Sequence, residues 1–231
     1  YCPECIFGFD FFEYSPTTFA PVDNSPVTPD YLLGPGDKLN INFYGNIEKE
    51  INTVINREGN IILPDIGLIN FLGLTFAEAD SLLAKKVETK LFGTYSTMSI
   101  GEIRSIGVYI LGEAYKPGRY VMSGLSSVSN ALFVSGGVNE QGSLRHIQVK
   151  RQNEIIRTYD FYDFLLRGSL ESDVVLQDGD IIFIPFIEQS VTLGGAFKRP
   201  HRYEIKEGET INDAIYLAGG FASEVIGNPT L

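Results

Sequence analysis

Two stretches of this chain align with each other without a gap: VYILGEAYKPGRYVMSGLSSVSNALFVSGGV, residues 108–138, and VTLGGAFKRPHRYEIKEGETINDAIYLAGGF, residues 191–221. The offset is constant, so that Pro117 falls on Pro200, 83 residues later. A duplication of this size is typical of a supersecondary module repeated in series. Serial modules usually build extended assemblies. The repeat therefore favours a structural or binding protein over an enzyme with one catalytic pocket.

Each copy of the repeat predicts the same order of elements: a strand, a turn with proline, a second strand, a capped helix and a glycine pair. Ser127 and Thr210 occupy equivalent helix N-cap positions. The pairs Gly136-Gly137 and Gly219-Gly220 follow the helices, where a left-handed backbone conformation suits glycine best. Glycines that cradle a phosphate stand before a helix rather than after it. The pattern therefore argues against a nucleotide site.

The segment before the repeats predicts a small mixed domain. Turn chemistry in Gly34-Pro35-Gly36-Asp37 precedes residues 39–43, where apolar and polar side chains alternate as in a half-buried strand. Residues 51–55 and 61–63 flank a second turn that contains Gly59. We expect these two segments to pair as a hairpin.

A helix with clear boundary signals follows in the same domain. The turn from Pro64 to Gly67 leads into a strand at residues 68–71. Thr75, with Glu78 three residues later, forms the capping box of a helix N-terminus, and Gly93 marks the helix end. The apolar stripe expected to face the core consists of Phe76, Ala79, Leu83 and Val87.

The bulk composition is that of an acidic globular chain. Its 231 residues are 44% hydrophobic and carry a formal net charge of −11, with an isoelectric point near 4.6. This charge repels phosphate backbones, so nucleic acid and anionic membrane surfaces are not expected as partners. No run approaches the ~18 to 20 apolar residues of a membrane-spanning helix, and we expect this stretch to be soluble.

The two cysteines, Cys2 and Cys5, stand in the run Cys-Pro-Glu-Cys at the start of the chain. The spacing allows a redox dithiol, half of a zinc site, or a local disulfide or pair of free thiols. A redox dithiol usually opens a helix after a strand, which this turn-rich segment does not predict. Further zinc ligands would have to come from His146, His201 or carboxylates without a matching spacing. The sequence favours the local disulfide or free thiols, and no cofactor or metal is expected.

The segments outside the aligned stretches differ in character. Residues 1–30 are rich in proline, polar and aromatic residues and predict an extended arm that packs by its Phe and Tyr side chains. The first repeat continues through a strand at 147–150, a helix around 160–167 and a buried strand that ends at Pro185. The second repeat lacks this length after Gly220, so we expect its module to be incomplete.

Three strings together resemble the bacterial outer-membrane polysaccharide export family: YLLGPGDKLNINFYG from Tyr31, EGNIILPDIGLINFLGLTFAEA from Glu58 and GEAYKPGRY from Gly112. The resemblance covers residues 31–231. The resemblance is specific because the motif residues occur together in this order, whereas each motif alone would be weak evidence for the family. In chain order these are Gly34, Gly36, Asp37, Gly59, Pro64, Gly67, Gly73, Arg104, Gly112, Pro117, Gly118, Gly136 and Gly137, with Pro200, Gly219 and Gly220 in the second repeat.

The resemblance implies an α+β fold with three segments that follow the arm (1–30). They are a polysaccharide export domain (31–105) and two soluble-ligand-binding β-grasp (SLBB) modules in tandem (106–187 and an incomplete 188–231). The second repeat departs from the family pattern at two places. Gly195-Ala196 replaces a frequent Gly-Glu, and Pro200-His201 replaces a frequent Pro-Gly. We expect a slightly different turn there, with a surface that serves a different contact.

The family implies a periplasmic ring of subunits at the outer membrane that guides capsule, exopolysaccharide or biofilm polysaccharide outward. Its implied partners are the polysaccharide, the inner-membrane copolymerase and export machinery, and further copies of the same chain. We therefore expect a non-enzymatic, ring-forming scaffold that is located in the periplasm and associated with the outer membrane.

Two other functions are weighed against this one. A carbohydrate-acting enzyme needs paired carboxylates, such as Asp178 and Asp180, but these stand in a turn signature, and the chain has no Trp for a sugar-stacking cleft. A periplasmic sensor of glycans or small ligands would use Tyr115, Arg119 and Tyr120. Turn packing or a subunit contact is the simpler explanation for these three residues, and the sensor is kept as the alternative.

Overall fold

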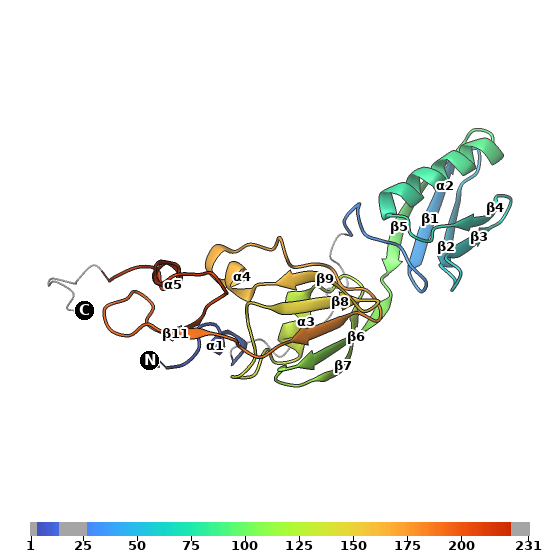
Figure 1. Ribbon diagram of the computed structural model, residues 1–231. Helices are drawn as coiled ribbons and strands as arrows, with labels where there is room; N and C mark the ends of the chain where they lie inside the picture. Colours follow the sequence, from blue (N-terminus) through green and yellow to red (C-terminus); the bar gives the residue numbers. More distant parts are fainter. Residues whose placement is uncertain (1–3, 14–26, 223–231) are drawn as a thin grey trace. The chain divides into compact units, whose positions relative to one another are not determined.

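The computed structural model describes residues 4–13 and 27–222 (Figure 1). These residues form two compact units with mixed helices and strands. The β1–β5 unit comprises residues 27–106 and 122–125, and the repeat unit comprises residues 4–13, 107–121 and 126–222. The α+β class expected from the sequence is confirmed.

The β1–β5 unit contains a three-stranded antiparallel sheet, a separate hairpin and a long helix. The sheet has the strand order β2-β1-β5, and β3 pairs with β4 in the hairpin. The elements are β1 (Lys38–Gly45), β2 (Lys49–Val54), β3 (Asn60–Leu63), β4 (Gly67–Asn70), α2 (Phe76–Lys90) and β5 (Thr94–Glu102).

The hairpin expected across Gly59 is wrong. β2 pairs with β1, whereas β3 pairs with β4 around the turn that begins at Pro64. The turn at Gly59 does exist: its φ is +78°, and the backbone N–H of Asn60 donates a 2.8 Å hydrogen bond to Asn56 Oδ1. Short alternating strands can pair on either side, so the pattern alone could not choose the partner.

One hydrophobic core lies between the sheet and α2, which covers one sheet face (Figure 1). Ile41 of β1 and the helix residues Leu83 and Val87 are fully buried. The predicted capping box is confirmed, because Thr75 N donates to Glu78 Oε2 at 2.8 Å and Glu78 N donates to Thr75 Oγ1 at 3.3 Å. The helix thus begins where the sequence placed it.

The first repeat forms a five-stranded sheet with the order β7-β6-β10-β8-β9. β10 lies parallel to β6 and antiparallel to β8, so the strand that ends before Pro185 stands in the middle of the sheet. The elements are β6 (Ser105–Gly112), β7 (Gly118–Ser123), α3 (Val128–Val134), β8 (Ile147–Arg151), β9 (Glu154–Tyr159), α4 (Phe161–Arg167) and β10 (Ile181–Ile184).

The second repeat follows the first in its described part, which reaches residue 222. Its elements are β11 (Ser190–Thr192), β12 (Arg202–Glu204) and α5 (Ile211–Leu217). Hydrogen bonds recur at the offset of the alignment: Tyr115 N to Gly137 O (2.9 Å) recurs as Lys198 N to Gly220 O (3.0 Å), and the Tyr120 hydroxyl to Lys116 O (2.5 Å) recurs as Tyr203 to Arg199 (2.5 Å). The common strand-turn-strand-helix fold expected for both copies is confirmed within these residues.

The glycine pairs close both repeat helices as expected. Gly136 and Gly137 have φ values of +80° and +88°, and Gly219 and Gly220 have +77° and +81°. The second glycine of each pair donates its N–H to a helix carbonyl, from Gly137 to Leu132 at 2.7 Å and from Gly220 to Ile215 at 2.9 Å. Positive φ is confirmed at all four positions.

The described part of the arm packs onto the repeats. It includes the short helix α1 (Asp10–Glu13), where Phe12 stacks on Phe161 with ring centroids 4.9 Å apart. Phe7 stacks on Tyr203 at 5.2 Å, and its N–H donates to Arg202 O of β12 at 2.9 Å. The expected aromatic packing is confirmed for residues 4–13, and the rest of the arm up to residue 26 lies outside the described residues.

Cys5 is disulfide-bonded. Cys2, the other cysteine of the chain, lies outside the described residues. A disulfide at Cys5 agrees with the local disulfide, one of the two states that the sequence favoured for the Cys-Pro-Glu-Cys run.

Candidate functional site

The three predicted contact residues share the hairpin formed by β6 and β7. Tyr115 is 62% exposed, and the Nζ of Lys116 lies 5.6 Å from the centre of its ring. The exposed Arg119 extends its guanidinium over Gly107, where an added Cβ would come within 2.2 Å of Nη2. The half-buried Tyr120 uses its hydroxyl to close the turn on Lys116. Of the three, Tyr115 offers the most ring surface for a contact.

The glycines and prolines of this hairpin shape the turn rather than a binding cavity. Gly112 has a φ of +77°, and an added Cβ would lie 2.1 Å from the carbonyl oxygen of Ile184. Pro117 is exposed, Gly118 is half-buried, and Pro200, the counterpart of Pro117, is buried. The two turns therefore differ in burial at the position where the sequence departed from the family pattern.

The Gly-Pro-Gly-Asp motif builds a buried polar cluster in the β1–β5 unit. Asp37 is fully buried and accepts hydrogen bonds from the Tyr31 hydroxyl (2.9 Å) and Gly34 N (2.8 Å). Arg104 donates to it from its backbone N (2.9 Å) and from Nη1 (2.6 Å). Burial, aided by the Asp37 charge, raises the pKa of the Tyr31 phenol. The cluster ties the first strand to the end of the domain, which is a structural role.

The remaining motif glycines of this unit occupy turns. Gly36 has a φ of +99° and Gly67 a φ of +95°. At Gly59 an added Cβ would come within 2.6 Å of Leu72 Cβ. Pro64 is exposed at the start of the hairpin turn. None of these positions presents a reactive side chain, and together they fix the path of the backbone.

A second polar cluster joins the two repeats, and we call it the repeat junction. Arg145 of the first repeat is 5% exposed and binds Glu209 of the second in a two-pronged contact, Nη1 to Oε2 at 2.6 Å and Nη2 to Oε1 at 2.7 Å. Its Nε lies 3.3 Å from Asp160 Oδ2. Lys206 reaches the same Asp160 oxygen at 2.6 Å. Both cations therefore contact carboxylates across the junction.

Glu204 anchors the junction from β12. It is 1% exposed and accepts hydrogen bonds from the Ser143 hydroxyl, from Leu144 N (2.8 Å) and from Arg145 N (3.2 Å). Backbone and hydroxyl donors of one loop thus surround the carboxylate, which compensates its burial. The arrangement can hold two modules together, and it exposes no group for chemistry.

Sequence reasoning missed the repeat junction, although the alignment contained a signal for it. Glu204, Lys206 and Glu209 align with Val121, Ser123 and Ser126, so the second repeat has charges where the first has none. Charges confined to one copy of a repeat indicate a contact that only this copy makes.

The paired carboxylates considered for an enzyme have structural partners. Asp178 accepts a 2.7 Å hydrogen bond from Gly107 N. Asp180 is 1% exposed and receives Nε and Nη2 of Arg151, both at 2.8 Å. Asp178 is exposed but is engaged by the backbone, and Asp180 is buried in an ion pair, so the two do not form a pair of free carboxylates in one cleft.

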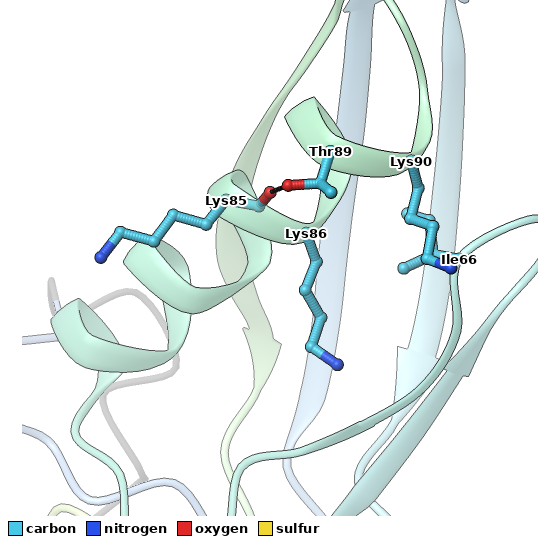
Figure 2. A pocket seen from close by; sticks show the side chains of 5 residues that line it. All are labelled: Ile66, Lys85, Lys86, Thr89 and Lys90. Atoms are coloured by element: carbon cyan, nitrogen blue, oxygen red, sulfur yellow. Dashed lines mark hydrogen bonds between the residues drawn. The ribbon is translucent and has the colours of Figure 1, made fainter.

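A shallow pocket of about 200 Å³ lies on α2 beside the β3–β4 turn. Figure 2 shows its lining residues Ile66, Lys85, Lys86, Thr89 and Lys90. Lys85 extends away from Lys86 and Lys90, so their ammonium groups do not converge on one point (Figure 2). Thr89 Oγ1 already donates to Lys85 O at 2.7 Å. The pocket therefore lacks the built geometry of an anion site.

Each of the two units thus contains a buried polar cluster, and comparison with known proteins adds the class that the chain resembles. The family model for the polysaccharide biosynthesis/export protein matches residues 25–100, and the SLBB domain model matches residues 190–226. These two matches and the relatives described next support the resemblance of the chain to the polysaccharide export family.

Two curated relatives match most of the chain. The polysialic acid transport protein KpsD of Escherichia coli is 29% identical over 181 residues, which are 78% of this chain and 32% of the relative. The EPS I polysaccharide export outer membrane protein EpsA of Ralstonia nicotianae (strain ATCC BAA-1114 / GMI1000) is 25% identical over 198 residues, or 84% of this chain and 52% of the relative. The chain therefore spans about a third of the first relative and about half of the second.

Among the described residues, no helix has both the length and the apolar character needed to cross a membrane. The family model and both relatives are named for export or transport.

Proposed function

We propose that this chain is part of a non-enzymatic scaffold that conducts polysaccharide through the periplasm to the outer membrane. The observation that carries the proposal is the succession of an export domain and an SLBB domain along one chain. The repeat junction supports it, since a conduit needs successive modules that are held to one another, and the two repeats are.

The cargo in this proposal is a capsule or exopolysaccharide chain. The named relatives concern polysialic acid and EPS I polysaccharide, and both are extended glycans. A net charge of −11 suits the transport of such hydrated polymers, because an acidic surface does not hold an acidic glycan tightly. The partners would be the inner-membrane copolymerase and export machinery and further copies of the chain.

Genetic removal tests the proposal in the organism that encodes the protein. Loss of the gene should abolish surface polysaccharide and leave the polymer inside the cell envelope, as seen by carbohydrate staining of intact and fractionated cells. The full-length gene should restore surface polysaccharide. Normal surface polysaccharide after deletion would remove the export function.

The hairpin of Tyr115, Arg119 and Tyr120 is proposed as a contact for glycan or for a neighbouring subunit, and it also carries the sensor alternative. Tyr115→Ala removes the exposed ring and should lower export without unfolding the protein, since a surface substitution usually changes stability within about 0.5 kcal/mol. Circular dichroism of the purified variant checks the fold. Unchanged export in a folded Tyr115→Ala strain would argue that the hairpin only packs its turn.

A further inference from the structure

The sheet of the β1–β5 unit has one covered face and one open face of opposite chemistry. α2 and the core cover the face of Leu39, Ile41 and Met98. Alternation sends the neighbouring side chains to the other side, and the strand register aligns them in rows. We call the rows from Asn40 to Tyr44 the polar sheet face; the next row of the same face holds Lys38 and the exposed Val54. The polar sheet face consists of Asn40, Asn42, Tyr44, Glu50, Asn52, Tyr95, Thr97 and Ser99.

Two tyrosines form an aromatic end to the polar sheet face. Tyr44 and Tyr95 are direct cross-strand partners, 49% and 50% exposed, with ring centroids 5.6 Å apart and planes inclined by 30°. About half of the surface of each tyrosine is thus open to solvent on a face that otherwise has smaller polar residues. Exposed aromatic pairs of this kind are suited to contact a flat, partly apolar ligand surface.

The rest of the polar sheet face offers hydrogen-bonding groups rather than apolar anchors. Asn42, Asn52, Thr97 and Ser99 are exposed, and the half-buried Asn40 lies over Gly101, where an added Cβ would meet its Oδ1 at 2.8 Å. Amides and hydroxyls both donate and accept, which matches the hydroxyl groups of a sugar. Glu50 contributes the single formal charge of this set.

The size of the face argues against a stable protein interface. Four residue steps along a strand span roughly 13 Å, and three strands are roughly 10 Å wide between their axes. The eight residues of the polar sheet face are also fewer than the roughly 20 to 30 residues that each partner contributes to a stable interface. A short run of sugar residues, however, needs no larger surface.

We propose that the polar sheet face binds a short segment of polyhydroxylated glycan, with sugar rings stacked on Tyr44 and Tyr95 and hydroxyls bonded to the asparagine and threonine side chains. This inference rests on the proposed function and names the surface that touches the cargo. Few contacts of this kind give weak binding, with a Kd of about 1 mM or more. A conduit benefits from weak contacts, because many copies in an assembly retain a polymer that each copy releases quickly.

Nuclear magnetic resonance of the whole 231-residue chain tests the proposal. Amide signals are followed while maltohexaose or a tetramer of sialic acid is added, so that neutral and acidic glycans are separate arms. We expect fast-exchange shifts centred on Asn42, Tyr44 and Tyr95 with at least one of them. Shifts with both sugars mean that neutral groups dominate recognition, and shifts with one sugar define the glycan charge that the face accepts.

Variants at the tyrosines sharpen the test. Removal of both rings by Tyr44→Ala and Tyr95→Ala should weaken binding about tenfold. Tyr44→Phe with Tyr95→Phe retains the rings and should bind nearly as the parent chain does. Tyr109→Ala, at an exposed tyrosine of the repeat unit, is the matched control and should leave the affinity unchanged. The dispersion of the amide spectrum verifies that each variant is folded.

Three results would overturn the proposal. They are the absence of shifts on the polar sheet face with either sugar, equal binding by the double alanine variant, and shifts of the same signals with protein concentration alone, which would assign the face to a subunit contact. If one of these results is obtained and gene deletion still abolishes surface polysaccharide, the export function is retained and only the proposal that this face binds glycan is rejected. Normal export after deletion removes the proposed function itself.

Discussion

At the residue scale, the two glycine pairs have the same backbone conformation in both repeats, but different side chains surround them. Gly137 and Gly220 are equivalent, with φ values of +88° and +81°. An added Cβ at Gly137 would come within 2.2 Å of Cγ of Phe12, whereas one at Gly220 would have open space around it. A side chain at either position would therefore strain the backbone, but only one at Gly137 would also clash with a neighbouring ring.

We predict that Gly220→Ala destabilises the repeat unit by about 1 kcal/mol, because alanine tolerates a positive φ poorly. Gly137→Ala should cost about 1 to 3 kcal/mol more, because the new methyl group displaces the Phe12 ring. Urea denaturation followed by far-ultraviolet circular dichroism measures both, since the chain has no Trp for fluorescence. Equal losses in the two variants would mean that the arm does not rest on Gly137 in solution.

At the element scale, the repeat junction connects β12 and the start of α5 to the loop before β8. Burial by itself raises the pKa of Glu209, but the hydrogen bonds from Arg145 and from Lys206 N outweigh it and hold the pKa below its ordinary value. A lowered pKa means that the folded state favours the carboxylate. The contribution is therefore complete above the unfolded pKa of about 4.3 and is lost as the pH falls through the lower folded value.

We predict that the repeat unit loses stability between about pH 5 and pH 3, and that Glu209→Gln makes this loss smaller. At pH 7 the variant should be less stable by about 1 to 3 kcal/mol, because Arg145 keeps its charge without a full partner. Hydrogen exchange of peptides from α4 and β12, measured at about pH 5 and at about pH 3, checks the loss of stability. Glu207→Gln, an exposed neighbour, is the control. An identical pH profile in Glu209→Gln and the parent would reject the role of this carboxylate.

The elements also show which parts of the fold the sequence could predict. Capping boxes and turn glycines depend on neighbours within a few residues, so Thr75 and the glycine pairs were placed correctly. Strand partners depend on distant segments, and the alternation in β3 did not reveal its pairing with β4. Glu204 is typical of a surface residue by type, and only the contact with a second module explains its burial. The polar sheet face likewise became visible only through the strand register.

At the scale of the whole molecule, the arm adds hydrophobic contacts to both repeats. Phe12 is 8% exposed and stacks on Phe161 of the first repeat, while Phe7 stacks on Tyr203 of the second. Residues 4–13 of the arm thus contact both repeats and add a second connection between them beside the repeat junction.

We predict that Phe12→Ala destabilises the repeat unit by about 3 kcal/mol, as truncation of a buried aromatic side chain does. Phe92→Ala, at a side chain that is 92% exposed in the β1–β5 unit, should change stability by less than about 0.5 kcal/mol. Thermal unfolding of the two variants side by side gives the comparison. A Phe12→Ala protein as stable as Phe92→Ala would show that the arm is dispensable for the repeats.

We further predict that the full-length protein forms a closed ring, because a series of unlike modules offers each subunit two different patches for head-to-tail contacts. The 231-residue chain alone in solution should associate weakly, since attachment to a membrane, where it occurs, raises the effective concentration of subunits. Electron microscopy and native mass spectrometry of the full-length protein determine its subunit number. A full-length protein that stays monomeric at the outer membrane and still supports export would contradict the ring.

The repeat junction also gives the tandem a direction. The loop of the first repeat that carries Ser143 and Arg145 accepts a module with acids and a lysine at the positions of Glu204, Lys206 and Glu209. The first repeat itself has Val121, Ser123 and Ser126 there, so it cannot take the second place in such a pair. A second copy of the first repeat in that place would leave Arg145 without Glu209, opposite a valine and two serines. The modules are alike in fold, yet their order along the chain is not reversible.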